Sequence, residues 1–452
     1  MTSLMIFTRD LRVDDNQALC AAAAEGPISC MFVMDDQIVN ASTASHRRQA
    51  FLQQCLDDLT NSLDDLGASL EIAHGNWSEQ IQNRAHELQA TNLHIADDYS
   101  SYAKRRLDHL GNWCASQNIE FQRHPGVTAL PPGDIQPAGG GEYKVFTPYW
   151  RSWLTAPKRP PLGSPKTLRG IDAAHTSFIP QGSHRIEHSH TDLVGGESHG
   201  LERLKHWLRT GVHQYEEMRD IPSIDGTSLL SPYLHFGCIS PLRLVELSRN
   251  VPGSEAFIRQ VAWRDFYSQI LNARPDASRQ DYRNRGDEWD YDDDVYKSWV
   301  DGTTGFPLVD AGMRQLRAEG LMHNRLRMVT ASFLIKNLHH DWRLGADYFM
   351  SQLIDGDVAN NYLNWQWVAG TGTDNNPHRV LNPTTQAKRF DKDAKYIRRW
   401  IPELSDLSAV DAVDPSIAVR QETGYPLPIV DHHESVEIFK GRRLANASKK
   451  PS

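Results

Sequence analysis

The sequence changes its periodicity near residue 200, and this change constrains the fold more than any other feature. Up to about residue 130, short apolar runs at 4–8, 27–35, 68–75 and 92–98 alternate with helical patterns at 45–67 and 77–90. Apolar runs of this length between helices are typical of buried parallel strands. The N-terminal part is therefore predicted to be an α/β domain built on a doubly wound parallel sheet.

From about residue 201 onward the patterns are helical, at 200–212, 241–251, 255–271, 312–338 and 344–354. This part is predicted to be an all-α domain. Pro, Gly, His and Ser dominate between about 130 and 200, which marks a long connector. Its histidines have no regular ligand spacing, so we expect a surface loop there and no metal site. We therefore expect an α/β domain over 1–130, a connector over 131–200 and a helical domain over 201–452.

Composition narrows the class of protein. The net charge of the 452-residue chain is −9, so nucleic acid would have to bind a local basic face. The five cysteines never form a CxxC pair, which argues against a zinc site or a disulfide framework. Arg9 and Asp10 interrupt the first apolar run too early for a signal peptide, and no apolar stretch approaches the roughly 20 residues of a membrane span. We expect a soluble, cytoplasmic protein that binds no membrane.

Residues 225–237, DGTSLLSPYLHFG, place three hydroxyl side chains before Pro232. Pro suits the first turn of a helix, and hydroxyls with free N–H groups at a helix N-terminus can bind an anion such as a diphosphate. Simple capping of the helix is the alternative. The GxGxxG fingerprint is absent after the first strand, which argues against a standard dinucleotide site in the α/β domain.

Arg327 lies early in an apolar helical pattern, where a partly buried guanidinium needs a carboxylate partner. Asp355 and Asp357 are the candidates, and a surface helix with solvated arginines is the alternative. The two acids open the stretch 355–376, which contains five Asn and two Trp but no Lys or Arg. Asn offers both a donor and an acceptor, which suits a buried ring system with polar edges. A loop over an aromatic core would have a similar composition.

In combination these motifs resemble those of the photolyase/cryptochrome flavoproteins, and within them the class I cyclobutane pyrimidine dimer (CPD) photolyases. The resemblance includes FTRDLRVDDNQAL, GEYKVFTPYWRSW and DGTSLLSPYL, then TGFPLVDAGMRQL, MHNRLRMVTASFL, DWRLGADYFMSQLIDGDVANN and NPTTQAKRFD. It covers all but the last few dozen residues. Its motifs in the helical part are long and specific, so we do not attribute it to chance.

The resemblance implies FAD bound in a U-shape inside the helical domain. The positions that match the surroundings of its ribityl chain and diphosphate are Tyr215, Thr227, Ser228, Leu229, Leu230 and Ser231. Asp355, Gly356 and Asp357 match the segment that faces the flavin edge and ribose, and Arg327 matches the arginine paired with the first acid. Asn361 matches the residue beside flavin N5. Trp365, Trp342 and Trp299 match the chain that carries an electron from the surface to photoexcited flavin.

The implied substrate is UV-damaged DNA. The wall of the dimer pocket matches Trp263, Asn324, Arg325, Met328 and Trp367. Gln260 is a departure, because it stands where CPD photolyases usually have Glu. Arg379 also matches a substrate position, but it lies in NNPHRVLNP, which is one residue shorter than the usual run.

The resemblance further implies an antenna chromophore. Arg48 and Asp98 match positions of deazaflavin-binding relatives, so we favour 8-hydroxy-5-deazaflavin, then FMN or none. The implied activity is light-driven cleavage of CPDs by a monomeric carbon–carbon lyase. A (6-4) photolyase is the alternative that Gln260 favours, although Asn324 stands where (6-4) enzymes have a second His. A cryptochrome photoreceptor would typically lose the lesion pocket, whose residues are present here. A dark flavin oxidoreductase would need a site for a hydride donor, and the sequence has no nucleotide fingerprint that supports one.

Overall fold

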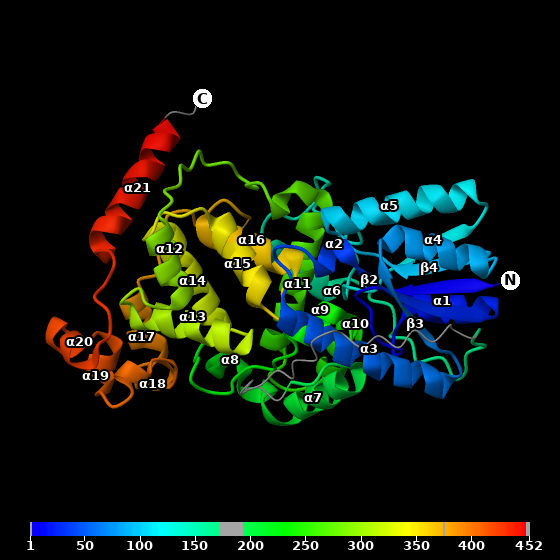
Figure 1. The fold of residues 1–452 in the computed structure, drawn as a ribbon, viewed down its shortest axis with the longest axis horizontal. Coiled ribbons are helices and arrows are strands. Elements are labelled where there is room, and N and C mark those ends of the chain that lie inside the picture. Colours follow the sequence, from blue (N-terminus) through cyan, green and yellow to red (C-terminus); the bar gives the residue numbers. More distant parts are fainter. Residues whose placement is uncertain (1, 172–192, 374–375, 449–452) are drawn as a thin grey trace.

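The structure is a computed structural model that describes residues 2–171, 193–373 and 376–448. An α/β part and a larger helical part lie side by side, and the C-terminal helix projects at the far end of the helical part (Figure 1). This confirms the predicted fold class. His184, His188 and His190 of the predicted connector lie outside the described residues.

The α/β part contains one five-stranded parallel sheet of order β3-β2-β1-β4-β5. Its strands are β1 (Ser3–Phe7), β2 (Ile28–Asp35), β3 (Leu70–Gly75), β4 (Asn92–Ala96) and β5 (Glu120–His124). Its helices are α1 (Gln17–Glu25), α2 (Asp36–Val39), α3 (His46–Leu66), α4 (Trp77–Glu87) and α5 (Ser101–Ser116). Strand residues alternate between two apolar clusters, one shared with α1 and α3 and the other with α4 and α5, so helices cover both faces.

The sequence analysis missed β5. Its residues, EFQRH, contain a single large apolar side chain and are half-buried or exposed. The strand lies at the edge of the sheet and pairs with β4 alone. An edge strand with one partner needs no continuous apolar run, so the pattern that identified the other four strands is absent here.

The helical part follows α6 (Phe146–Thr155). It comprises α7 (Glu197–Thr210), α8 (Tyr215–Met218), α9 (Ser231–Phe236), α10 (Pro241–Ser248), α11 (Glu255–Ala273), α12 (Asp293–Asp301), α13 (Pro307–Glu319) and α14 (Asn324–Lys336). It continues with α15 (Trp342–Gln352), α16 (Val358–Ala369), α17 (Pro383–Phe390), α18 (Lys395–Trp400), α19 (Ala409–Val413), α20 (Ile417–Thr423) and α21 (His432–Ser448). No helix within the described ranges is both long and apolar enough to cross a membrane.

The helical pattern at 312–338 is broken into two helices, α13 and α14. Gly320 adopts a left-handed φ of 65°, which ends α13. His323 then caps α14, because its Nδ1 accepts the N–H of Arg325 at 3.2 Å. The break matters for function because it places residues 322–325 at a helix start rather than inside a helix.

The segment predicted as a connector contains α6, which packs against α11. The Trp153 Nε1–H donates to Asp265 Oδ2 at 2.9 Å, and the Leu130 N–H donates to the same oxygen at 3.0 Å. Burial raises the pKa of Asp265 to about 6 although these hydrogen bonds lower it. The proposed limits of 131–200 remain a prediction.

Candidate functional site

Asp355 lies between α15 and α16 and is paired with Arg327 of α14. Arg327 Nη2 donates to Asp355 Oδ2 at 2.9 Å, and its Nε donates to the Met322 carbonyl at 2.8 Å. The predicted carboxylate partner of Arg327 is thus confirmed as Asp355. The second oxygen, Oδ1, is buried and accepts no hydrogen bond from the described residues. A buried carboxylate oxygen without a donor is costly, so this atom marks a place for a ligand's N–H or O–H group.

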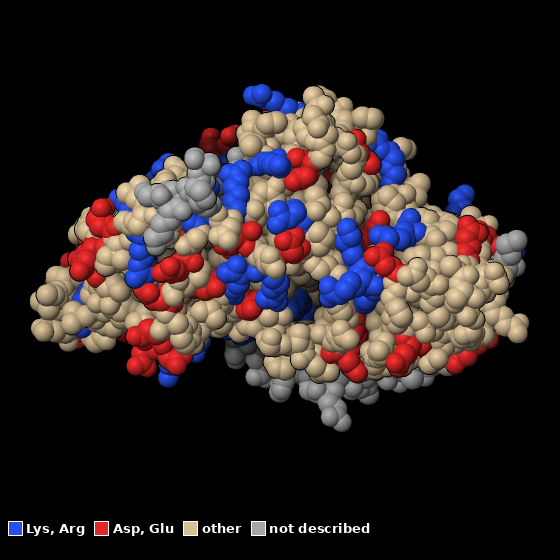
Figure 2. Space-filling view, turned by 90° about the horizontal axis from the view of Figure 1, so that it is seen from above, with Lys and Arg blue, Asp and Glu red and all other residues tan. Residues whose placement is uncertain are grey.

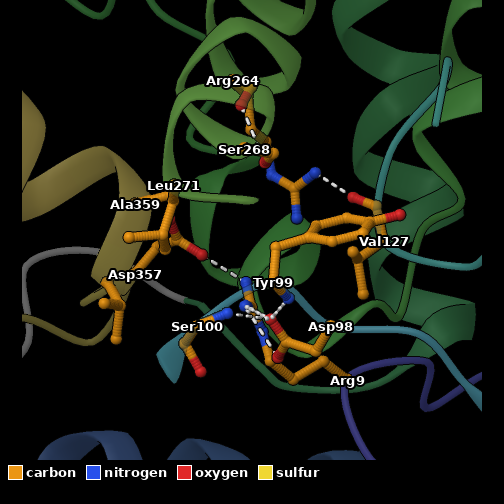
Figure 3. A pocket seen from close by; sticks show the side chains of 11 residues that line it. Arg9, Asp98, Tyr99, Ser100, Val127, Arg264, Ser268, Leu271, Asp357 and Ala359 are labelled. Atoms are coloured by element: carbon orange, nitrogen blue, oxygen red, sulfur yellow. Dashed lines mark hydrogen bonds and ion pairs between the residues drawn. The ribbon is translucent and has the colours of Figure 1, made fainter. Parts of the chain in front are cut away.

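Asp357 joins the two parts of the chain. Its Oδ1 caps α16 by accepting the Asn360 N–H at 2.8 Å, and its Oδ2 is paired with Arg9 Nη2. Arg9 follows β1, and its Nη1 lies 3.3 Å from Asp98 Oδ2, just after β4. Figure 3 shows this guanidinium between the two carboxylates, with Arg264 of α11 across the same small pocket.

The charges around Asp357 reinforce one another. Burial alone would raise the pKa of Asp357, but the positive charges of Arg9 and Arg264 hold it well below its usual range. Burial, together with the charge of Arg9, lowers the pKa of His235 far below its usual range. Asp357 is therefore ionised and His235 neutral near pH 7.

The predicted diphosphate segment is a loop between α8 and α9. Leu229 has a left-handed φ of 52°, and the Leu230 N–H donates to Ser228 Oγ at 3.4 Å. Thr227, Ser228 and Leu229 are half-buried, Leu230 is buried, and exposed Ser231 starts α9 ahead of Pro232, as the sequence predicts. Tyr215 starts α8, and burial raises its pKa to about 12.

Gly356 and Asn361 lie where α15 meets α16. Arg48 of α3 donates from Nη1 to the carbonyls of Met350 at 2.6 Å and Leu353 at 2.9 Å. A Cβ on Gly356 would lie 2.6 Å from the same Nη1, so Gly lets the guanidinium reach the end of α15. Asn361 Nδ2 donates to the Ala346 carbonyl at 2.9 Å.

Arg48 is not among the residues lining the pocket of Asp98, so the structure does not bring the two predicted antenna residues together there. Burial lowers the pKa of Arg48 to about 10, although the charge of Asp355 opposes this. Their antenna role stays a prediction.

The three tryptophans predicted to carry electrons are buried. Trp299 of α12 and Trp342 of α15 are 0% exposed and Trp365 of α16 is 3% exposed. The rings of Trp365 and Trp299 meet edge to face, with centroids 6.2 Å apart. Trp342 Nε1 donates to Asp281 Oδ1 at 2.8 Å. The expected path begins at the surface, whereas none of these three rings reaches it, and their role stays a prediction.

Two half-buried tryptophans, Trp263 of α11 and Trp367 of α16, lie on linked helices. Phe146 of α6 stacks on Trp263 with centroids 3.7 Å apart and planes 8° apart. One turn after Trp263, the Tyr267 hydroxyl donates to Asn364 Oδ1 of α16 at 3.0 Å. Phe146 thus packs against Trp263, which is one wall of the predicted lesion pocket.

The other predicted lesion residues are polar or sulfur-containing side chains on α11, α14 and the segment before α17. Arg325 Nη2 lies 2.8 Å from Asp220 Oδ1, and Asn324 Nδ2 lies 3.9 Å from Met328 Sδ. Arg379 lies over the Trp367 ring at 5.7 Å. Gln260 Nε2 makes a long contact of 3.4 Å to the Ala256 carbonyl of its own helix, which leaves the amide available to a ligand.

The sequence analysis did not identify Arg9, Arg264 or His235 as residues of the site. Topology provides a signal for Arg9. The strand order reverses between β1 and β4, and Arg9 and Asp98 follow the carboxyl ends of these two strands. Ligands and functional contacts gather at such a switch point. The signal for Arg264 and His235 is weaker, because both depend on long-range packing.

Comparisons with known proteins agree with this arrangement. Residues 3–166 match the family model described as DNA photolyase, and residues 257–443 match the FAD binding domain of DNA photolyase. A deoxyribodipyrimidine photo-lyase of Streptomyces griseus is 43% identical over 450 residues, 98% of this chain and 99% of the relative. A protein of the same name from Halobacterium salinarum is 36% identical, over 95% of this chain and 96% of the relative.

Two solved structures share the whole fold. A bacterial class III photolyase from Agrobacterium tumefaciens has a TM-score of 0.91 at 31% identity, covering 99% of this chain and 98% of its own. A cryptochrome of Synechocystis has a TM-score of 0.90 at 29% identity, covering 97% and 98%.

A parallel α/β domain joined to a helical FAD-binding domain defines a class of light-dependent flavoprotein. Within it, the chain belongs to the photolyase/cryptochrome family. The described residues fit FAD, since Asp355 keeps an unpaired buried oxygen and a hydroxyl-rich loop leads into α9.

We expect Arg9→Gln to lower the free energy of unfolding by about 3 kcal/mol, because it leaves two largely buried carboxylates without their cation. Urea denaturation measures the loss. The matched control is Arg317→Gln, which removes an exposed ion pair with Asp301 (3.1 Å) and should cost less than about 1 kcal/mol. Equal losses in the two variants would contradict the role given to Arg9.

His323 should contribute stability that is lost as pH drops from about 6.5 towards 4. Burial lowers the pKa of His323 to about 4, so between these values the unfolded chain binds a proton that the folded chain does not. The contribution of His323 to stability therefore rises with pH across this window, whereas that of Asp265, whose pKa is raised, falls. Thermal unfolding between pH 4 and 7 compares the wild type with His323→Gln, which keeps an acceptor for the Arg325 N–H, and the stability of the variant should rise less with pH than that of the wild type. An unchanged slope would show that His323 does not titrate in this way.

Proposed function

We propose that this protein is a deoxyribodipyrimidine photo-lyase, which uses light to split CPDs in UV-damaged DNA. The observation that carries the proposal is the pair of half-buried tryptophans on α11 and α16, together with the unpaired oxygen of Asp355 in the segment that leads into α16. Helix α16 thus carries Trp367, one aromatic wall of the proposed lesion pocket, and begins directly after the proposed flavin contact. Full-length similarity to relatives of this name supports the assignment.

FAD in its reduced form supplies the light-driven electron that opens the dimer. The residues of this chain hold and orient the participants. Asp355, with Arg327 neutralising one oxygen, offers the other to a flavin N–H or O–H group. Thr227, Ser228 and the backbone of Leu229, Leu230 and Ser231 hold the diphosphate, and Tyr215 closes that side. Asn361 stands beside the flavin ring.

The lesion has to leave the duplex to reach the buried site, and unstacking costs less for a damaged pair than for an intact one. Trp263 and Trp367 recover stacking energy, roughly 1–3 kcal/mol per base. Phe146 stacks on Trp263, so this wall is in place before DNA binds. Asn324, Met328 and Gln260 contact the base edges, while Arg325 and Arg379 are placed for the neighbouring phosphates.

A local basic face supports DNA binding by a protein of net charge −9. Figure 2 shows a face on which Lys and Arg side chains gather around a central hollow, with acidic side chains among them and further out. Phosphate contacts of this kind supply most of the sequence-independent affinity for DNA.

The proposal also includes the photolyase class and the antenna chromophore. The motifs favour class I, and on them we place the protein in class I as part of this proposal, although a bacterial class III photolyase shares the fold at 31% identity. The proposed antenna is 8-hydroxy-5-deazaflavin, with FMN or none as alternatives. We also propose that the protein acts as a monomer in the cytoplasm.

The test is light-dependent repair. Protein loaded with FAD and reduced chemically should restore CPD-containing oligonucleotide under blue light and leave it unchanged in the dark. Gel-shift measurements on CPD, (6-4) and undamaged oligonucleotides follow binding, and reversed-phase chromatography, which separates the damaged strand from its repaired isomer, follows repair. Repair of the (6-4) lesion alone would show that this lesion, and not the CPD, is the substrate. Binding of FAD without any repair would favour a photoreceptor.

Gln260 provides a second test. Gln260→Ala should weaken binding of CPD oligonucleotide by about 1–3 kcal/mol, because a base edge in a closed pocket loses its partner. Gln260→Glu should keep or raise the repair yield, since it restores the residue usual in this resemblance. The matched control, Gln421→Ala on the exposed face of α20, should leave both unchanged. Unaltered binding by Gln260→Ala would remove this residue from the site.

A further inference from the structure

The end of α16, which carries the proposed lesion wall Trp367, is bound by a residue of the C-terminal helix α21. Arg443 of α21 is 4% exposed, and its Nη2 donates to the Ala369 carbonyl at 2.8 Å. Ala369 is the last residue of α16, two positions after Trp367. Carbonyls in the last turn of a helix have no partner within the helix, so a donor from another element fixes where they lie. Arg443 thereby fixes the turn that carries Trp367.

Asp287 and Gly370 hold the Arg443 guanidinium at this helix end. Arg443 Nη2 donates to Asp287 Oδ2 at 2.6 Å, and both side chains are less than one-tenth exposed. Gly370 ends α16 with a left-handed φ of 87°, and a Cβ there would lie 3.0 Å from Arg443 Nη1. The glycine therefore lets the guanidinium approach the end of the helix. Arg285 adds a second donor, because its Nε donates to the Gly370 carbonyl at 3.2 Å.

A buried lysine binds the neighbouring segment, which carries Arg379. Lys336 of α14 is 2% exposed, and its Nζ donates to the Arg379 carbonyl. One turn earlier on α14, Ser332 Oγ accepts the Leu381 N–H at 3.2 Å, so α14 holds this segment at two points. The Arg379 side chain is exposed, and its guanidinium lies over the Trp367 ring at 5.7 Å. Lys336 therefore fixes the backbone from which Arg379 reaches the proposed pocket.

The surroundings of Lys336 are unfavourable for a lysine. Burial, together with the charges of Arg443 and Arg379, lowers the pKa of Lys336 to about 7, and the charge of Asp287 opposes this. Lys336 Nζ and the Arg443 guanidinium lie 5.6 and 5.1 Å from the centre of the same Phe439 ring. An apolar side chain of similar length would avoid the desolvation of a charge. Packing alone therefore does not explain a lysine here, whereas donation to the Arg379 carbonyl does.

We propose that Lys336 and Arg443 are positioning residues of the lesion pocket. Arg443 sets the place of Trp367 through the end of α16, and Lys336 sets the place of Arg379 through its carbonyl. Both side chains are buried, so they act through these two residues and not on DNA directly. The inference rests on the proposed function, since it assumes that a flipped CPD meets Trp367 and that a DNA phosphate meets Arg379.

The first experiment measures dissociation constants of FAD-loaded protein for CPD oligonucleotide at several salt concentrations. Lys336→Met keeps the length of the side chain but removes the donor, and it should weaken binding about tenfold. The slope of log Kd against log salt should fall by about 0.9, because one phosphate contact is lost. Thermal stability should not fall, since a buried charge is removed. Lys440→Met is the matched control and should leave binding unchanged, because this half-exposed lysine pairs with Glu437 of its own helix at 2.8 Å.

The second experiment removes the contact between α21 and α16. Arg443→Met is combined with Asp287→Asn so that no buried charge is left alone. The combined variant should bind CPD oligonucleotide about tenfold more weakly and bind undamaged oligonucleotide as the wild type does, because only a flipped lesion stacks on Trp367. The control is Arg442→Gln, which removes an exposed ion pair with Asp290 (2.9 Å) next to Arg443 and should leave both affinities unchanged.

Double-mutant cycles separate positioning from a general loss of structure. Lys336→Met should have no further effect in the Arg379→Gln background, and the combined α21 variant should have none in the Trp367→Ala background. Additive effects in these cycles overturn the inference, and so do unchanged dissociation constants or loss of bound FAD from Lys336→Met. Wild-type protein that does not prefer CPD oligonucleotide would overturn the proposed function and the inference with it. A preference for CPD in the wild type that both variants retain in full would overturn the inference alone.

Discussion

The guanidinium of Arg9, shared between Asp98 and Asp357, is the contact on which the site depends. It fixes the carboxyl edge of the sheet against Asp357, the residue that caps the start of α16. Removing one partner of a buried ion pair is strongly destabilising, so the three groups have to be kept together. Because Asp357 also caps α16, the same contact sets where this helix begins.

Helix α16 then places most of the chemistry. Asn361 lies one turn after Asp357, Trp365 faces the buried aromatic cluster with Trp299, and Trp367 is half-buried beside Arg379. A shift of this helix would move the proposed flavin contact, the electron path and the lesion wall at once. An ion pair between the two parts of the chain therefore supports both the proposed cofactor site and the proposed lesion pocket.

Sequence reasoning succeeded where a local rule applied. The four predicted apolar runs are strands in the structure. Arg327 is paired with Asp355, as expected for a charge in an apolar helix. It failed where the cause was distant or weak. Strand β5 has too little apolar character, and the break at Gly320 was hidden in a continuous helical pattern. The contact of Arg9 with Asp357 joins residues 348 positions apart. The burial of Trp299 depends in part on packing by Tyr348, which lies far along the chain and is not revealed by the neighbouring sequence.

The packing of α6 against α11 determines what happens if the polypeptide chain is cut into two fragments. Phe146 and Trp153 precede residues 172–192, whereas their partners Trp263 and Asp265 follow them. A chain cut within that range would yield two fragments, of which the first holds the ring behind the pocket wall and the second holds the wall itself. Neither fragment has a complete pocket, so activity regained on mixing them would report their association. The protein is thus suited to fragment complementation, with light as the trigger for the readout.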